Sequence, residues 1–202
     1  MSRFGLLFLL FSLVLPGSGA AAEDLASALV RSTSDRMLST LDAKRREIEQ
    51  RPELIYQLVG QIVVPHFDFT RITQAAVGRY WREATPQQRG ALSREFEQLL
   101  VRTYAKALLA YSGQQIIYLP LRPGHDAGDV TVATAVQEPG APSVPINYRL
   151  YLKDGAWKVY DVIIDNVSLI ANYRSSFASQ IRRDGIDGLI KMLRDLNAGG
   201  RE

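Results

Sequence analysis

Apolar residues in the N-terminal half of the chain recur at helical spacing. Between Glu23 and Gln50 they fall near an i, i+4 ridge with charged residues between them, which predicts one long helix ending before Pro52. A broad apolar face over residues 54–63 predicts a second helix, and Pro65 closes it because proline has no amide hydrogen to donate.

Two capping signals mark the helices that follow. Asp68 is placed to cap a third helix, which is expected to include Tyr80. The segment Thr85-Pro86-Gln87-Gln88 is a capping box with proline at the first helical position. It predicts a long amphipathic helix that runs to about Tyr111.

After Gly113 the apolar residues alternate with polar ones, which is the pattern of half-buried strands. The alternation predicts four strands, at residues 114–121, 129–137, 144–152 and 156–164. Asp154-Gly155 is a two-residue turn of the kind favoured in hairpins, and it joins the last two strands.

The turn also predicts the register of this hairpin. Leu152 should oppose Trp157, Leu150 should oppose Val159, and Tyr148 should oppose Asp161. One face is then apolar and carries Ile146, Tyr148, Leu150, Leu152, Trp157, Val159 and Ile163. The other face carries Asn147, Arg149, Tyr151, Lys158 and Tyr160.

Helical spacing returns from Ser168 to about Asp184, Gly185 breaks it, and residues 188–197 add a last short helix. The predicted fold class is α+β, with N-terminal helices followed by an antiparallel twisted sheet that helices cover on one face. The apolar stripes of helices and sheet converge, but periodicity does not distinguish a filled core from an apolar cavity.

The first residues have the order of a secretory signal. Arg3 gives a short positive region, residues 4–15 are apolar and uncharged, and small residues follow Pro16-Gly17. The apolar run is shorter than the roughly 20 residues that a membrane-spanning helix needs. We therefore expect residues 1–22 to be removed, residues 23–197 to form one domain, and residues 198–202 to be a flexible tail.

The cysteine and histidine counts and the net charge indicate where the protein acts and which classes of partner are not expected. The chain has no cysteine, so it can form no disulfide and carries no lipid-modified N-terminal cysteine. We expect the mature protein to be free in solution outside the cytoplasm. The formal net charge of only +3 does not suggest a nucleic-acid partner. With two histidines and no cysteine, the chain has few of the residues that usually bind metal ions.

Few polar residues suggest catalysis. His66 and Asp68 could orient an imidazole, but no nucleophile pattern accompanies them and Asp68 is expected to cap a helix. His125-Asp126 lies in a Pro-Gly-rich loop, and we expect both residues to form part of a solvent-exposed turn. Asp161 is expected on the apolar face of the hairpin, either as a structural acceptor, which we favour, or as a catalytic base with a raised pKa.

Seven segments, in order and along essentially the whole mature chain, form one recognisable set. They are Val64-Pro65-His66-Phe67-Asp68-Phe69, Gly78-Arg79-Tyr80-Trp81, Ala84-Thr85-Pro86-Gln87-Gln88-Arg89, Leu100-Val101-Arg102-Thr103-Tyr104, Trp157-Lys158-Val159-Tyr160-Asp161-Val162, Val167-Ser168-Leu169 and Asn172-Tyr173-Arg174-Ser175-Ser176-Phe177. Together they resemble the MlaC family of periplasmic phospholipid-binding proteins, also called toluene-tolerance proteins. Where the family usually has glycine before the Val-Ser step, this chain has Asn166, which tolerates the left-handed conformation.

The resemblance implies a carrier with no catalytic residues, cofactor or metal, on a cone of the NTF2-like type that encloses an apolar cavity. It implies a diacyl phospholipid as ligand. It also implies two partners that maintain outer-membrane lipid asymmetry, an outer-membrane lipoprotein–porin complex and an inner-membrane lipid ABC transporter complex. The residues expected to line the lipid site are Phe96, Leu99, Leu100, Tyr104, Leu108, Val132, Tyr148, Leu150, Val159 and Ile163.

Two other functions stay open, an enzyme on the same cone with Asp161 as base, and an adaptor whose apolar surface binds proteins only. A lipid entrance is expected at Val64-Pro65-His66, because Pro65 weakens helical continuity there and Gly78 lowers the stability of the next helix. The alternative is that these residues only shape a tight corner.

Overall fold

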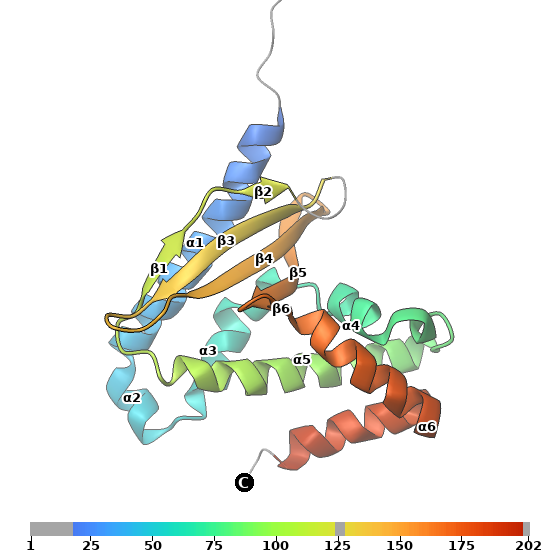
Figure 1. Cartoon of the computed structure of the whole chain (residues 1–202). Coiled ribbons are helices and arrows are strands. Elements are labelled where there is room, and N and C mark those ends of the chain that lie inside the picture. The colour runs from blue at the N-terminus through green and yellow to red at the C-terminus, as the bar shows by residue number, and fades with distance from the viewer. Residues whose placement is uncertain (1–17, 124–127, 200–202) are drawn as a thin grey trace, which may run out of the picture.

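The computed structural model describes residues 18–123 and 128–199. A twisted antiparallel sheet lies above helix α5, α1 runs along the sheet, and α4 and α6 pack to one side (Figure 1). The elements are α1 (Ser18–Ala43), α2 (Arg45–Gln50), α3 (Leu54–Ile62), η1 (Val64–His66), α4 (Phe69–Val77), η2 (Gly78–Trp81), α5 (Pro86–Leu108), β1 (Gln115–Tyr118), β2 (Arg122–Pro123), β3 (Val130–Gln137), β4 (Val144–Lys153), β5 (Ala156–Ile164), β6 (Val167–Ser168) and α6 (Leu169–Gly199).

The α+β class is confirmed, and both predicted caps are present. The Asp68 side chain accepts a hydrogen bond from the amide of Arg71 at 3.0 Å. At the start of α5, the Gln88 amide donates to Thr85 Oγ1 at 3.2 Å and the Thr85 amide donates to Gln88 Oε1 at 3.0 Å. Such a reciprocal cap satisfies two amides that the helix itself leaves without partners.

Two predicted helix boundaries differ from the structure, and one predicted break is present. The first helix is interrupted at Lys44, whose φ of −105° and ψ of 12° are not helical, although Lys44 still donates to the carbonyl of Thr40. The third helix ends at Gly78, because its positive φ of 64° turns the chain, so Tyr80 lies in η2. The predicted break at Gly185 is confirmed by its φ of 71°.

The sheet has the order β1-β3-β4-β5-β6, and β2 pairs with β3. The four predicted strands correspond to β1, β3, β4 and β5, and the structure adds the two-residue strands β2 and β6. Asp154 and Gly155 both have positive φ, as the predicted two-residue turn requires. Asn166 has a φ of 64°, so it adopts the left-handed conformation that was expected of it.

The predicted register holds only near the turn. Leu150 pairs with Val159 as expected, but Arg149 pairs with Asp161, so Tyr160 is an extra residue in β5. Such a bulge reverses the alternation of every residue beyond it. The predicted pairing of Tyr148 with Asp161 is therefore wrong, and Tyr148 pairs with Val162.

Because of the same bulge, Ile163 pairs with Asn147 rather than joining the apolar face. Val162 and Ile164 take its place and pack with the apolar residues under α1.

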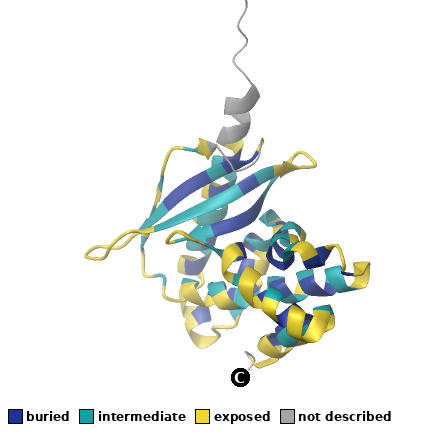
Figure 2. Ribbon diagram, turned by 45° about the vertical axis from the view of Figure 1, so that its right-hand side comes forward, coloured by how far each residue is buried: buried dark blue, intermediate teal, exposed yellow. Residues whose placement is uncertain are grey.

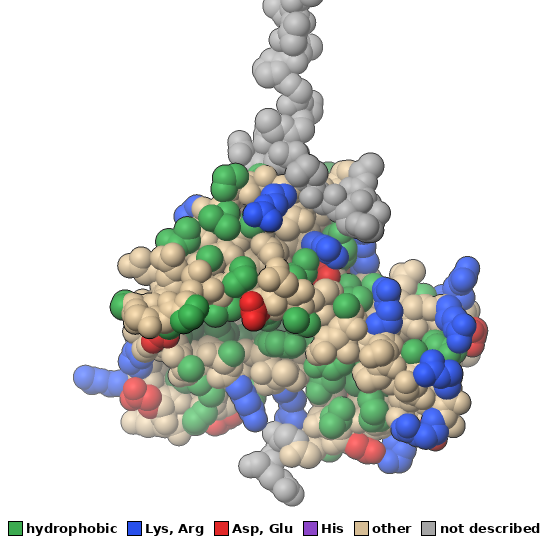
Figure 3. Space-filling model, viewed as in Figure 1, with side chains coloured by type: hydrophobic (Ala, Val, Ile, Leu, Met, Phe, Trp, Pro, Cys, Tyr) green, Lys and Arg blue, Asp and Glu red, His purple; other side chains and the backbone are tan. Residues whose placement is uncertain are grey.

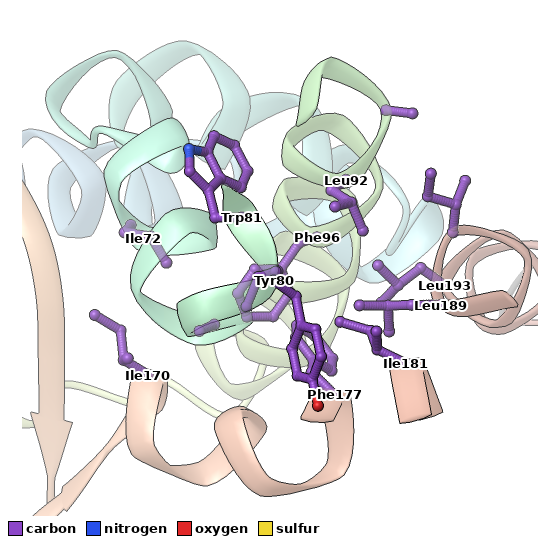
Figure 4. Close-up of a cluster of buried hydrophobic side chains, with 14 of the residues drawn as sticks. Ile72, Tyr80, Trp81, Leu92, Phe96, Ile170, Phe177, Ile181, Leu189 and Leu193 are labelled. Carbon is purple, nitrogen blue, oxygen red and sulfur yellow. The ribbon is translucent and has the colours of Figure 1, made fainter. Parts of the chain in front are cut away.

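Among the described residues, buried side chains form three clusters. Figure 2 marks the buried positions along the ribbon. The largest joins α4, η2, α5 and α6, and Phe96 and Phe177 lie within it (Figure 4). The Phe96 ring is edge to face with the rings of Tyr173 and Phe177, and the ring centroids are 4.9 Å apart in each pair. A second joins α1, α2, α3 and α5, and a third joins α1 to the sheet. Truncating a fully buried phenylalanine such as Phe96 typically costs about 3–5 kcal/mol, so the first cluster fixes α5 firmly against α4 and α6.

The predicted signal sequence lies mostly outside the described residues, as does the His125-Asp126 pair. Helix α1 begins at Ser18 and passes the expected cleavage point after Ala22. Removal of residues 1–22 and flexibility of residues 198–202 remain predictions.

Candidate functional site

An apolar cavity of about 560 Å³ lies between the sheet and α5. Helix α5 packs against α3, α4 and α6, and the sheet packs against α1, so the two layers are held apart over part of their length. In Figure 3 hydrophobic side chains gather in a hollow between the sheet and the helices below it. The volume falls within the ~300–1,000 Å³ typical of ligand pockets.

Helices α1, α3 and α5 and the sheet all contribute side chains to the wall of the cavity. Leu29, Val30, Met37 and Leu38 come from α1, and Val59 and Val63 come from α3 and its C-terminal end. The floor and roof are formed by α5 and the sheet, and the residues are Leu100, Val101, Tyr104, Ala105, Leu108, Ile116, Val136, Ile146, Tyr148, Val159, Val162 and Ile164.

Three titratable side chains of this wall, Tyr148, Tyr104 and His66, favour their neutral forms. Burial, with Tyr118 nearby, raises the pKa of Tyr148 to about 12, and burial also raises the pKa of Tyr104. Burial and the neighbouring Lys158 and Arg36 lower the pKa of His66, which favours its neutral form at pH 7. The cavity therefore favours an alkyl group over a charged one.

The structure brings five of the ten predicted site residues to the cavity wall: Leu100, Tyr104, Leu108, Tyr148 and Val159. The other five lie elsewhere. Phe96 and Leu99 pack in the cluster between α5 and α6, and Val132 and Leu150 are buried under α1. Ile163 is displaced by the bulge.

Sequence reasoning missed the contribution of α1 and α3 to the wall. Leu29 and Val59 lie on the apolar faces that predicted those helices, so their burial was visible in the sequence. Their position around a cavity was not, because an apolar stripe does not show what faces it.

Asp161 is a structural acceptor, as the favoured interpretation expected. It is 2% exposed and accepts hydrogen bonds from Ser168 Oγ at 2.7 Å and from Arg149 Nη1 and the Ile170 amide, each at 3.4 Å. These bonds join β4, β6 and the start of α6. They use both oxygens of the Asp161 carboxylate.

His66 and Asp68 do not form the oriented pair considered above. His66 contributes to the cavity wall, whereas Asp68 accepts from Lys153 Nζ at 2.8 Å and from the Tyr151 hydroxyl. Burial raises the pKa of Asp68, but the bonds from Lys153, Tyr151 and the Arg71 amide outweigh burial and hold the pKa below its usual value. No hydrogen bond between His66 and Asp68 is found in the described ranges.

Residues 64–69, here called the wall segment, separate the cavity from a second hollow of about 750 Å³, here called the outer cleft. Val64, Phe67 and Phe69 contribute to both, and the two phenylalanine rings stack with their centroids 5.7 Å apart. The outer cleft is bounded on its far side by the β4–β5 hairpin and the first half of α5.

Bonds to the β4–β5 hairpin hold the wall segment. The Asp68 amide donates to the Val159 carbonyl at 2.9 Å, and Lys158 Nζ donates to the Pro65 carbonyl at 2.6 Å. Together with the Lys153–Asp68 ion pair, these bonds attach one short segment to one hairpin.

None of the described helices combines the length and apolar character needed to cross a membrane. Residues 18–123 and 128–199 contain no group of three or more histidine, cysteine or acidic residues placed to hold a metal ion.

Comparison with known sequences identifies a family and two relatives. The sequence matches the family profile described as MlaC protein over residues 31–195. It is 28% identical to the toluene tolerance protein ttg2D of Pseudomonas putida over 92% of this chain and 85% of the relative. It is 25% identical to the intermembrane phospholipid transport system binding protein MlaC of Haemophilus influenzae, over 85% of this chain and 81% of the relative.

One similar solved structure is the phospholipid-binding protein from Ralstonia solanacearum in complex with a phospholipid. It is 36% identical, covers 88% of this chain and 99% of its own, and superposes with a TM-score of 0.79.

Proposed function

Because this chain belongs to the MlaC family, we propose that it is a soluble periplasmic carrier that binds a phospholipid and shuttles it between the two membranes. The observation that carries the proposal is the apolar cavity between the sheet and α5. The related Ralstonia protein, solved with a phospholipid, supports it.

The acyl chains of the lipid would lie in the apolar cavity. Each methylene exposed to water costs ~0.8 kcal/mol, so a run of about ten methylenes opposes free diffusion by ~8 kcal/mol. A wall of leucine, valine and isoleucine removes most of this cost. It needs no energy source, because the bilayer interior and the cavity are about equally apolar.

Transport between membranes would need a donor and an acceptor. The family resemblance implies an outer-membrane lipoprotein–porin complex and an inner-membrane lipid ABC transporter complex as these partners. The carrier would then contribute to outer-membrane lipid asymmetry, and the partners would set the direction of transport.

A vesicle transfer assay tests the carrier function. Fluorescent phospholipid in donor vesicles should reach acceptor vesicles across a protein-permeable barrier faster when the protein is present. Lipid analysis at the end should recover the phospholipid intact. No acceleration would contradict the carrier function, and release of fatty acid by the purified protein would favour the enzyme alternative.

A further inference from the structure

The outer cleft is lined by basic side chains, whereas the described residues that line the apolar cavity include no lysine or arginine. Arg89 and Arg94 project into it from α5, and Lys153 and Lys158 come from the β4–β5 hairpin opposite. The Arg94 side chain folds back over its own helix toward Gly90. Its Nη1 lies 3.4 Å from the position that a Cβ on Gly90 would occupy. Basic side chains from two separate elements therefore face one hollow.

Three of these four cations have no acidic partner among the described residues. Arg89 donates to the carbonyls of Trp81 and Arg82 at 2.9 and 3.3 Å, and Lys158 donates to the carbonyl of Pro65. These acceptors are neutral, so they fix the side chains without cancelling their charge. Only Lys153 is neutralised, by Asp68.

The acids of the outer cleft offset this charge only in part. Asp68 is already paired with Lys153, and Asp154 belongs to the exposed hairpin turn. Burial raises the pKa of Glu97, the third acid, which lowers its tendency to carry charge.

Ser93 supplies a hydrogen-bond donor at the same place. Its hydroxyl oxygen is buried and has no hydrogen-bond partner within the described structure, although the residue contributes to the cleft. A buried hydroxyl without a partner costs free energy, and a ligand oxygen at this point would remove that cost.

From this arrangement we propose that the outer cleft binds a phosphate group, held by Arg94, Arg89 and Lys158 with Ser93 as a hydroxyl donor. Guanidinium and ammonium groups bind phosphate oxygens through short, charge-assisted hydrogen bonds. The phosphate can come from the headgroup of a bound phospholipid or from free phosphate. The first source rests on the proposed function, because the wall segment lies between the cleft and the cavity and would have to part for one lipid to occupy both.

The test titrates isotopically labelled protein with inorganic phosphate at constant ionic strength and follows amide chemical shifts. Lipid-free protein should show saturable shifts at Gly90, Ser93 and Lys158. Protein loaded with phospholipid should show no further shift if the headgroup occupies the cleft, and the same shifts if the site takes free phosphate.

Two variants sharpen the test. Arg94→Gln breaks no described hydrogen bond, and it should weaken phosphate about tenfold, the factor that corresponds to about 1.4 kcal/mol. Ser93→Ala should weaken phosphate several-fold without lowering thermal stability, because it removes an unpartnered hydroxyl. Arg46→Gln, an exposed charge on α2, is the matched control and should leave the affinity unchanged.

The proposal is overturned if neither phosphate nor bound phospholipid shifts the cleft amides, or if Arg46→Gln weakens phosphate as much as Arg94→Gln does. The carrier function is judged separately. A protein that transfers lipid without these shifts would contradict only the phosphate site, and one that shows the shifts but transfers no lipid would contradict only the carrier function.

Discussion

Lys153 Nζ lies 2.8 Å from Asp68 Oδ2, and this ion pair joins the β4–β5 hairpin to the N-terminus of α4. Asp68 therefore has two structural tasks, because the same carboxylate caps α4 through the Arg71 amide. Its position also fixes the wall segment between the apolar cavity and the outer cleft.

Replacing Asp68 with asparagine should lower the free energy of unfolding by about 1–3 kcal/mol, the range for losing charged hydrogen bonds at a mostly buried site. Thermal or urea unfolding would measure the change. Asp195→Asn is the control, because the Lys191–Asp195 pair is exposed and should contribute less than about 1 kcal/mol. Equal losses in both variants would contradict the proposed role of Asp68.

The same carboxylate predicts a pH dependence. Its pKa in the folded protein lies below the ordinary value of 3.8, so its contribution to stability is complete above that value. The contribution is lost as the pH falls through the folded pKa. The stability difference between the natural protein and Asp68→Asn should therefore shrink below about pH 4 and stay constant from pH 5 to 7, which urea unfolding across this range would show.

Asp161 should matter for stability and not for chemistry. Asp161→Asn weakens the bonds from Ser168, Arg149 and the Ile170 amide, and it should cost about 1–3 kcal/mol. At temperatures where the variant stays folded, lipid transfer should be retained. Asp165→Asn is the matched control, since Asp165 is exposed and asparagine accepts its φ of 48°. Loss of transfer in folded Asp161→Asn would contradict a purely structural role.

Filling the apolar cavity should reduce lipid binding without unfolding the protein. Val101 of α5 contributes to the wall, so Val101→Trp places an indole in space that acyl chains would use. Lipid occupancy should fall while thermal stability is kept or rises. Val167→Trp is the control, because Val167 is 55% exposed and lies outside the cavity. Full occupancy in folded Val101→Trp would show that the acyl chains lie elsewhere.

Lipid binding should change the exchange of the wall segment. Hydrogen exchange on lipid-free and lipid-loaded protein should show more protection of residues 60–80 in the loaded form if the wall segment is the entrance. Equal protection there, with a change in another segment, would place the entrance elsewhere. In that case Pro65 and Gly78 would only shape a corner.

Features set by a few neighbouring residues could be predicted from the sequence. The Thr85 capping box and the Asp154-Gly155 turn are determined by local conformational preference, and both are present. The bulge at Tyr160 could not be predicted, because residues 159–164 are mostly apolar and give no alternation that would reveal an extra residue. Its consequence was the wrong pairing partner for Asp161 and the wrong face of the sheet for Ile163.

The site was harder to predict than the fold, for a related reason. Phe96 and Leu100 are one helical turn apart on the same apolar side of α5, yet Phe96 packs against Phe177 and Leu100 faces the cavity. Periodicity shows that both are buried. Which one faces a cavity depends on how α6 and the sheet diverge from α5, and this is a property of the packed structure.

Native mass spectrometry of the gently purified protein tests the central claim most directly. The account predicts a population whose extra mass equals that of a diacyl phospholipid, and Val101→Trp should reduce this population while Val167→Trp should not. Protein that carries no lipid, and that takes up none after incubation with phospholipid vesicles, would contradict the account.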